Sequence, residues 1–272
     1  MTPIPGSSRR PVAIGLSAAA LTLLAACSSG AASSSSAVST STAAAGSGQS
    51  ALLAAAAAAQ DINSAVTTLH VKVAGQQASS QTGTLQYQRT PSLMSQDTHI
   101  TAEGGNTEIK MILTGQDMYF SEPGLPTSKA WMKFSLDALK GKSASFANLV
   151  KSMQSSNFTN QAELFAVAKN AHEVGTATID GVATTEYAGS FRASDALSAL
   201  SPSVRDVLGA QLKTLGDGVI SFHEWIDGQH HMRQVIENET VKGNAVTTTM
   251  NVTTINQPVQ ISLPAASDII SQ

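Results

Sequence analysis

Alternation of apolar and polar residues is the feature that most constrains the fold of this chain. It recurs with a period of two in residues 83–89, 106–114, 182–191, 219–226, 232–241 and 245–255. Such alternation is typical of strands that bury one face. The dipeptide Asp227-Gly228 lies between two of these stretches and indicates a hairpin with a two-residue turn. We therefore predict about eight to eleven strands, mostly in an antiparallel meander.

Helical periodicity interrupts the strand pattern in three places. The alanine-rich stretch 51–69 follows Ser50, which is expected to cap a helix. Residues 135–156 and 194–215 carry apolar side chains three and four positions apart, and Ser201 is expected to cap a helix beginning at Pro202. A large antiparallel sheet curls because strand twist accumulates, and its concave face has to be covered. The sequence thus predicts an α+β fold, a curved antiparallel half-barrel with helices covering the concave face.

A hollow between sheet and helices would be lined by apolar side chains, which suits an acyl chain. Flexible methionine side chains would adapt to such an irregular ligand. We expect the hollow to be lined by Met111, Leu113, Phe120, Phe146, Leu149, Leu200 and Phe222. A filled core has the same alternation, however. A second interpretation therefore stays open: a ligand-free envelope lipoprotein that serves as an interaction or sensor-accessory module.

The N-terminal segment has the layout of a bacterial lipoprotein signal. Arg9 and Arg10 precede an apolar stretch, 12–26, that is short for a permanent membrane span. Leu24-Ala25-Ala26-Cys27 matches the lipobox, in which the cysteine sulfur receives a diacylglycerol and the chain is cut before it. Cys27 is the only cysteine, so it has no partner for an internal disulfide. We expect residues 1–26 to be the signal peptide and acylated Cys27 to anchor the protein at the extracytoplasmic face of the cell membrane.

Composition divides the remainder into a tether and one domain. After Cys27, residues up to 50 are almost wholly Ser, Ala, Thr and Gly, which carry too little apolar surface to order themselves. We predict a disordered tether at 27–50 and a single domain, expected to be monomeric, at 51–272. The net charge of −3 and the lack of a basic stripe in the sequence speak against a nucleic-acid partner.

The sequence supports a metal site or a hydrolase active site less well than a binding function. His223, Glu224, His230 and His231 could approach one another across a hairpin, but Asp227 stands where the zinc-protease pattern requires histidine. We favour a polar outer face there, without a metal. No nucleophile elbow of the Gly-x-Ser-x-Gly type follows a predicted strand, although a triad assembled from separate segments stays open. We therefore expect no catalytic residues and no cofactor.

Several motifs, taken in order, resemble the LppX/LprAFG lipoproteins of actinobacteria. After the lipobox and the tether come Gly83-Thr84-Leu85-Gln86-Tyr87 with Pro91, then residues 115–119, Trp131, residues 174–182 leading to Tyr187, residues 224–228, and residues 257–264. The resemblance implies the fold of the LolA/LolB carriers, an unclosed antiparallel half-barrel with helices over its mouth. It also implies a protein that binds lipid or acylated glycolipid for transport or storage at the cell envelope, with an envelope transporter as a candidate partner. It supplies no catalytic residues.

Overall fold

The computed structural model describes residues 47–75, 78–102, 105–124, 130–139, 150–151 and 153–271. Cys27, the predicted signal peptide and most of the predicted tether lie outside the described residues. So do Phe146 and Leu149, which were expected to line the hollow.

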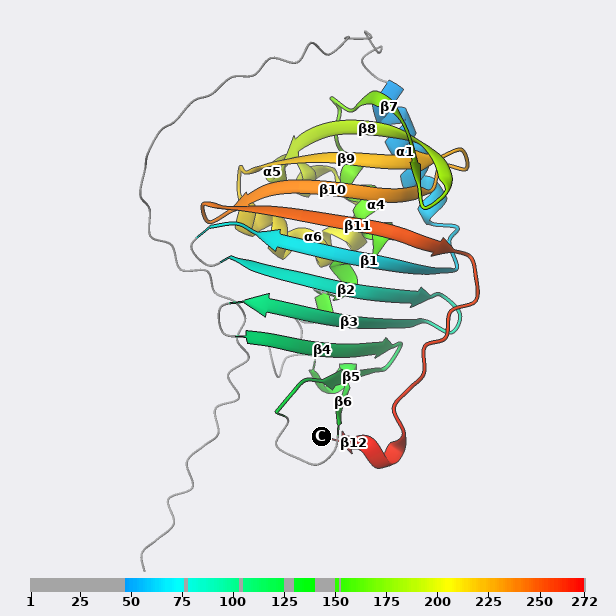
Figure 1. The fold of residues 1–272 in the computed structure, drawn as a ribbon, viewed down its shortest axis with the longest axis vertical. Coiled ribbons are helices and arrows are strands. Elements are labelled where there is room, and N and C mark those ends of the chain that lie inside the picture. The colour runs from blue at the N-terminus through cyan, green and yellow to red at the C-terminus, as the bar shows by residue number, and fades with distance from the viewer. Residues whose placement is uncertain are drawn as a thin grey trace, which may run out of the picture.

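Twelve strands form one open sheet (Figure 1). Its order is β12-β6-β5-β4-β3-β2-β1-β11-β10-β9-β8-β7, and the described neighbours are antiparallel except for the parallel pair β12–β6. Two meanders, β1–β6 and β7–β11, join where β1 pairs with β11. The bounds are β1 Ser64–Val73, β2 Ser79–Gln88, β3 Leu93–Ala102, β4 Gly105–Thr114, β5 Asp117–Ser121, β6 Trp131–Ser135, β7 His172–Ile179, β8 Val182–Arg192, β9 Val219–Asp227, β10 Met232–Val241, β11 Asn244–Ile255 and β12 Ile269–Ser271.

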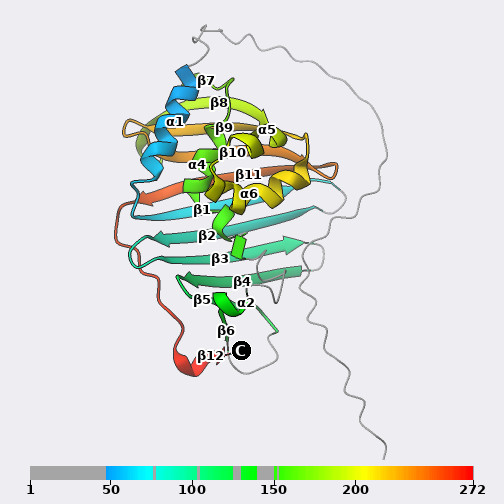
Figure 2. The same cartoon turned by 180° about the vertical axis from the view of Figure 1, so that it is seen from behind.

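The helices lie on one side of the sheet (Figure 2). They are α1 Ser47–Ala59, α2 Leu136–Leu139, α4 Phe158–Phe165, α5 Ala193–Ala199 and α6 Pro202–Leu215, with a 3-10 turn at Ala266–Asp268. The predicted α+β class, with an open antiparallel sheet and helices over one face, is confirmed. We call the side that carries the helices the inner face and the opposite side the outer face.

The predicted helix boundaries hold in part. The helix predicted for 51–69 ends at Ala59, and Ser64 already starts β1, because Val66, Thr67 and Thr68 are β-branched and favour a strand. The stretch 194–215 is two helices, and the Ser201 side chain caps α6 by accepting from the Val204 N–H, as predicted. Helix α4 was not predicted, although Asn157 caps it by accepting from the Thr159 N–H at 3.1 Å.

The Asp227-Gly228 hairpin exists, but its turn is longer than predicted. Strand β9 ends at Asp227 and β10 begins at Met232. The Asp227 carboxylate holds the connection by accepting from the backbone N–H groups of Gln229 at 2.8 Å and His231 at 2.9 Å. His230 takes the left-handed conformation with φ 62°. The side chain of Asp227 therefore organises a longer loop than the dipeptide alone indicated.

Two apolar clusters lie on the inner face. The first, which we call the helix-covered core, joins α1, α4, α5 and α6 to strands β8–β11 and β1. Phe165 is fully buried there, and its ring centre lies 4.8 Å from that of Phe222. The second cluster lies under β2–β6 and is described below as the candidate site. None of the helices in the described ranges is long and apolar enough to cross a membrane.

Candidate functional site

A methionine-rich cluster covers the inner face of the β2–β6 half of the sheet. Its buried members are Leu85, Met94, Met111, Leu113, Met118, Phe120, Met132, Phe134 and Met153. Five of these nine are methionine, although the whole chain contains only eight. Methionine is unbranched and polarisable, so its side chain adapts to partners of irregular shape. Among the described residues, this cluster is therefore the apolar region whose side chains can best adapt to a bound molecule.

Strand register brings three of the predicted lining residues together here. Met111 on β4 lies opposite Phe120 on β5, and Leu113 lies opposite Met118. Because side chains alternate between faces, Met111, Leu113 and Phe120 all point inward. The structure thus places them in one cluster, with side chains almost fully buried.

Leu200 and Phe222 lie elsewhere. Both belong to the helix-covered core, at 2% and 1% exposure. Phe222 packs against Phe165 and Phe191, with ring centres 4.8 Å and 6.1 Å away. The predicted lining set is therefore divided between two clusters. Sequence analysis missed Met94 and Phe134, whose alternation with polar neighbours was the available signal.

Few elements cover the methionine-rich cluster in the described part of the chain. Leu136 from α2, Val150, and Ile270 from β12 pack against it while remaining partly exposed. The longer helices α1, α4, α5 and α6 contribute their buried side chains to the helix-covered core instead. The two halves of the inner face are thus covered differently.

A buried amide borders the methionine-rich cluster. Gln96 on β3 lies between Leu85 and Met111 on the neighbouring strands and is 8% exposed. Its amide nitrogen donates to the Thr98 hydroxyl at 3.1 Å, but its buried carbonyl oxygen has no hydrogen-bond partner among the described residues. An unpaired buried acceptor is costly, so this oxygen is available to a hydroxyl of a bound molecule.

Three glutamates also face inward, in the other half of the sheet. Burial raises the pKa of Glu224 on β9 to about 8, and neither carboxyl oxygen has a hydrogen-bond partner in the described part of the chain. Burial, together with the nearby charge of Glu239, raises the pKa of Glu237 on β10 to about 8. Burial also raises the pKa of Glu239. Burial in an apolar setting disfavours a charged carboxylate, so it favours the protonated form of Glu224 and Glu237 at pH 7.

The alternative metal arrangement around the β9–β10 hairpin does not form. His223 points to the outer face and contacts the Glu186 carboxylate at 2.7 Å, whereas Glu224, the next residue, is buried on the inner face. The His231 ring lies 3.5 Å from the Asp227 carboxylate, which also accepts from Arg233 at 2.7 Å. These side chains therefore serve separate ion pairs rather than one shared centre.

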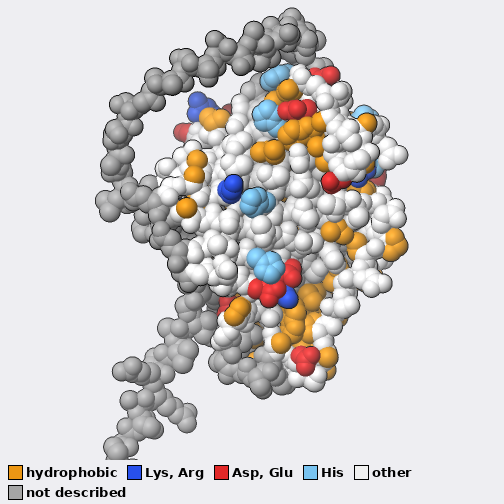
Figure 3. Space-filling view, in the orientation of Figure 1, with side chains coloured by type: hydrophobic (Ala, Val, Ile, Leu, Met, Phe, Trp, Pro, Cys, Tyr) orange, Lys and Arg blue, Asp and Glu red, His pale blue; other side chains and the backbone are white. Residues whose placement is uncertain are grey.

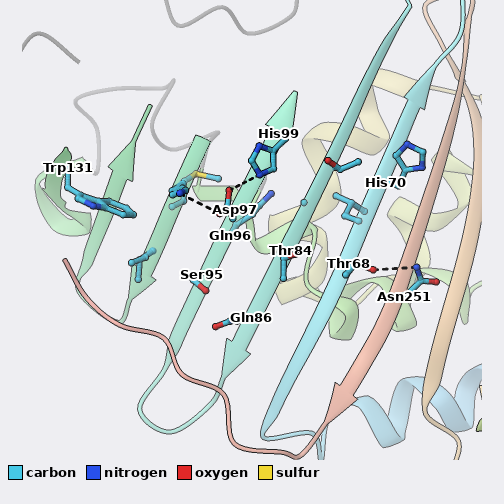
Figure 4. Close-up of a pocket in the computed structure, with 16 residues that line it drawn as sticks. Thr68, His70, Thr84, Gln86, Ser95, Gln96, Asp97, His99, Trp131 and Asn251 are labelled. Atoms are coloured by element: carbon cyan, nitrogen blue, oxygen red, sulfur yellow. Dashed lines mark hydrogen bonds and ion pairs between the residues drawn. The ribbon is translucent and has the colours of Figure 1, made fainter. Parts of the chain in front are cut away.

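The outer face carries a groove of about 710 Å³ over β11, β1, β2, β3 and β4, with Trp131 of β6 at one end (Figure 4). Uncharged polar side chains dominate its lining: Thr68, Thr82, Thr84, Gln86, Ser95 and Asn251. Figure 3 shows the same face as mostly uncharged, with scattered charged side chains. Nothing in the alternation pattern indicated this groove, because outward residues of antiparallel sheets are commonly polar.

Four charged or titratable side chains meet at one side of this groove. His99, Asp97 and Glu108 bring ligand atoms within 4.8 Å of one another. The Lys110 ammonium, however, lies 3.0 Å from Glu108 and 3.8 Å from Asp97. The hydrogen bond to Glu108 is the main reason that the pKa of Lys110 is raised. A resident cation already neutralises the carboxylates, so the group does not favour a metal ion.

The chain was compared with protein families, curated proteins and solved structures. The model of a family described as "Family of unknown function (DUF6612)" matches residues 49–188. No curated protein matches the chain in sequence. Among solved structures, LprF from Mycobacterium bovis is similar, with a TM-score of 0.49 and 16% identity over 80% of this chain and 97% of that one.

Two further solved structures were found by the same comparison. The lipoprotein LppX from Mycobacterium tuberculosis has a TM-score of 0.46 and 15% identity, over 79% of this chain and 97% of that one. A LolA superfamily protein from Nitrosomonas europaea has a TM-score of 0.27 and 9% identity, over 80% of this chain and 94% of that one. LprF and LppX are members of the lipoprotein family that the sequence resembles.

Proposed function

This chain belongs to DUF6612, a family of unknown function, and we propose that it is a non-catalytic envelope lipoprotein that binds the acyl chains of a lipid or glycolipid. The methionine-rich cluster carries this proposal. It concentrates five methionine side chains, which adapt to ligands of irregular shape, on one half of the inner face. The resemblance of the sequence to the LppX/LprAFG lipoproteins supports the same ligand class.

Burial of hydrocarbon supplies the binding free energy in this mechanism. At about 25 cal/mol per Å² of apolar surface removed from water, an acyl chain gains several kcal/mol without any specific polar contact. Affinity should therefore rise with chain length. At the edge of the cluster, the unpaired Gln96 oxygen accepts a hydrogen bond from the polar end of the lipid.

The N-terminal segment gives this binding a place in the cell. We propose that acylated Cys27 holds the protein at the outer side of the cell membrane and that residues 27–50 tether the domain to it. A tether of that length spans about 25 to 30 Å on average. The domain can then reach the membrane surface to load a lipid and pass it to a transporter.

Substitution of Met118 by tryptophan tests the proposal. Met118 is 1% exposed in the methionine-rich cluster, and a larger side chain there would occupy the space of the ligand. The variant should bind a fluorescent long-chain fatty acid at least tenfold more weakly in titration. It should also carry less lipid by mass spectrometry after gentle extraction.

Met250→Trp is the matched control. Met250 is 3% exposed and faces the same side of the sheet, but it lies in the helix-covered core. Overpacking there should cost about 1–3 kcal/mol of stability while lipid binding persists. If Met118→Trp bound the probe as tightly as the wild type, the methionine-rich cluster would not be the binding site. If the wild type bound no probe, the ligand-free interaction module would be the better interpretation.

A further inference from the structure

We propose that the groove on the outer face is a second binding site, for a neutral polysaccharide chain. It lies on the opposite side of the sheet from both apolar clusters, so it is distinct from the proposed lipid site. Five strands spaced about 4.8 Å apart give it a length of roughly 20 Å across the sheet. Its volume of about 710 Å³ is in the range of ligand-binding clefts. It can therefore hold several sugar rings in a row.

The floor of the groove offers hydrogen-bonding groups that are not already engaged. Gln86 and Ser95 face each other across β2 and β3, and Thr84 faces Asp97 in the same row. Within the described ranges, the side chains of Gln86, Ser95 and Thr84 make no hydrogen bond to another protein group. Hydroxyls and amides both donate and accept, which is also the chemistry of sugar hydroxyls. A row of such groups on a rigid sheet matches a polyhydroxylated chain.

Trp131 supplies the apolar part of such a site. It lies on β6 at one end of the groove (Figure 4) and is only partly buried. The outward direction of its indole follows from the register, because Met132 and Phe134 on the same strand point inward. An indole combines a flat apolar face with a polar N–H. The carbon–hydrogen face of a sugar ring can stack on that surface while its hydroxyls reach the strands.

The charges in the groove favour a neutral ligand over an ionic one. Lys110 is paired with Glu108 at 3.0 Å and with Asp97 at 3.8 Å, and His99 lies 3.7 Å from Asp97. A ligand with its own charge would have to compete with these pairs. Asp97 can still accept from a sugar hydroxyl, since a carboxylate has several acceptor positions. A lipid-free neutral polysaccharide outside the membrane therefore fits best.

Glycan titration tests this site on the full chain. Isothermal calorimetry would be run with maltohexaose, cellohexaose and mannohexaose as neutral probes and with hexagalacturonate as the anionic one. We expect at least one neutral hexasaccharide to bind, and Trp131→Ala and Gln86→Ala each to weaken it by tenfold or more. Trp225→Ala is the matched control, because Trp225 also faces outward but stacks on His223 outside the groove.

Each outcome decides for or against the groove. Unchanged binding by Trp225→Ala, together with loss by Trp131→Ala and Gln86→Ala, would support it. Circular dichroism and fatty-acid binding should stay at wild-type levels in all three variants, which separates this site from the lipid site. No binding of any neutral hexasaccharide, a preference for the anionic probe, or equal effects of Trp131→Ala and Trp225→Ala would overturn the proposal.

Discussion

Glu224 shows how a single residue sets the stability of this fold. It lies between Tyr187 on β8 and Val235 on β10, is 1% exposed, and within the described ranges has no hydrogen-bond partner for either carboxyl oxygen. Its pKa is raised to about 8 by burial, from an ordinary value of 4.5. Between those two pH values the unfolded chain has lost the proton while the folded chain still holds it. The contribution of Glu224 to stability is therefore greatest below about pH 4.5 and is lost as the pH rises to about 8.

Glu224→Gln should remove this pH dependence. Each group of this kind changes the free energy of unfolding by about 1.4 kcal/mol per pH unit within its window, and Glu237 contributes in the same direction. Urea unfolding at pH 5 and pH 8 should show a smaller difference for the variant than for the wild type, with a gain in stability at pH 8. The exposed acid Glu173 provides the control, Glu173→Gln, which should leave the difference unchanged. An unaltered slope in Glu224→Gln would contradict the argument.

Individual elements were predictable where apolar residues recur at alternate positions. The stretches 219–226 and 232–241 keep enough of this alternation, despite the inward Glu224, Glu237 and Glu239, and became β9 and β10. Strand β3 was missed because its inward residues include Gln96 and Thr98, which hide the alternation. The sequence also could not separate the two apolar clusters, because Met111 and Phe222 alternate with polar neighbours in the same way. Only the strand order assigns them to different halves of the sheet.

Helix α1 depends on one close approach to the rest of the domain. Gly48 is buried, and a Cβ atom built there would overlap the backbone of Ala171. Gly48→Ala should therefore push α1 off β7 and cost about 1–3 kcal/mol. Thermal unfolding and limited proteolysis near residue 60 would detect the change.

Gly209, in a different helix, supplies the matched control for the Gly48→Ala substitution. It lies inside α6, where a new Cβ would meet its nearest atom, in Leu197, at 3.7 Å. Gly209→Ala should be neutral or stabilise by up to about 1 kcal/mol, because alanine favours helix. Equal losses in the two variants would mean that the overlap with the Ala171 backbone does not explain the effect.

At the scale of the whole molecule, each of the two meanders carries a different apolar cluster on its inner face. Strands β8–β11 carry the helix-covered core, and β2–β6 carry the methionine-rich cluster. The C-terminal strand β12 adds Ile270 to that second cluster and pairs with β6. The last residues of the chain thus take part in covering the proposed lipid site.

Deletion of residues 269–272 should weaken lipid binding more than it weakens the fold. Without Ile270 the methionine-rich cluster is more exposed, so we expect a several-fold weaker affinity for a fluorescent fatty acid and a melting temperature lowered by only a few degrees. Deletion of Gln272 alone is the control and should change neither. Full affinity in the longer deletion would show that β12 is not part of the cover.

The seam between β1 and β11 joins residues that are far apart in the chain. Ser64 accepts from the Asn256 N–H at 2.8 Å, and the Asn63 N–H donates to the Asn256 side chain at 2.7 Å. Strand β1, near the start of the domain, can therefore pair with β11 only after almost the whole domain has been synthesised. If the polypeptide passes through a translocon from its N-terminus, the β1–β11 pairing cannot be completed until about residue 255 has emerged.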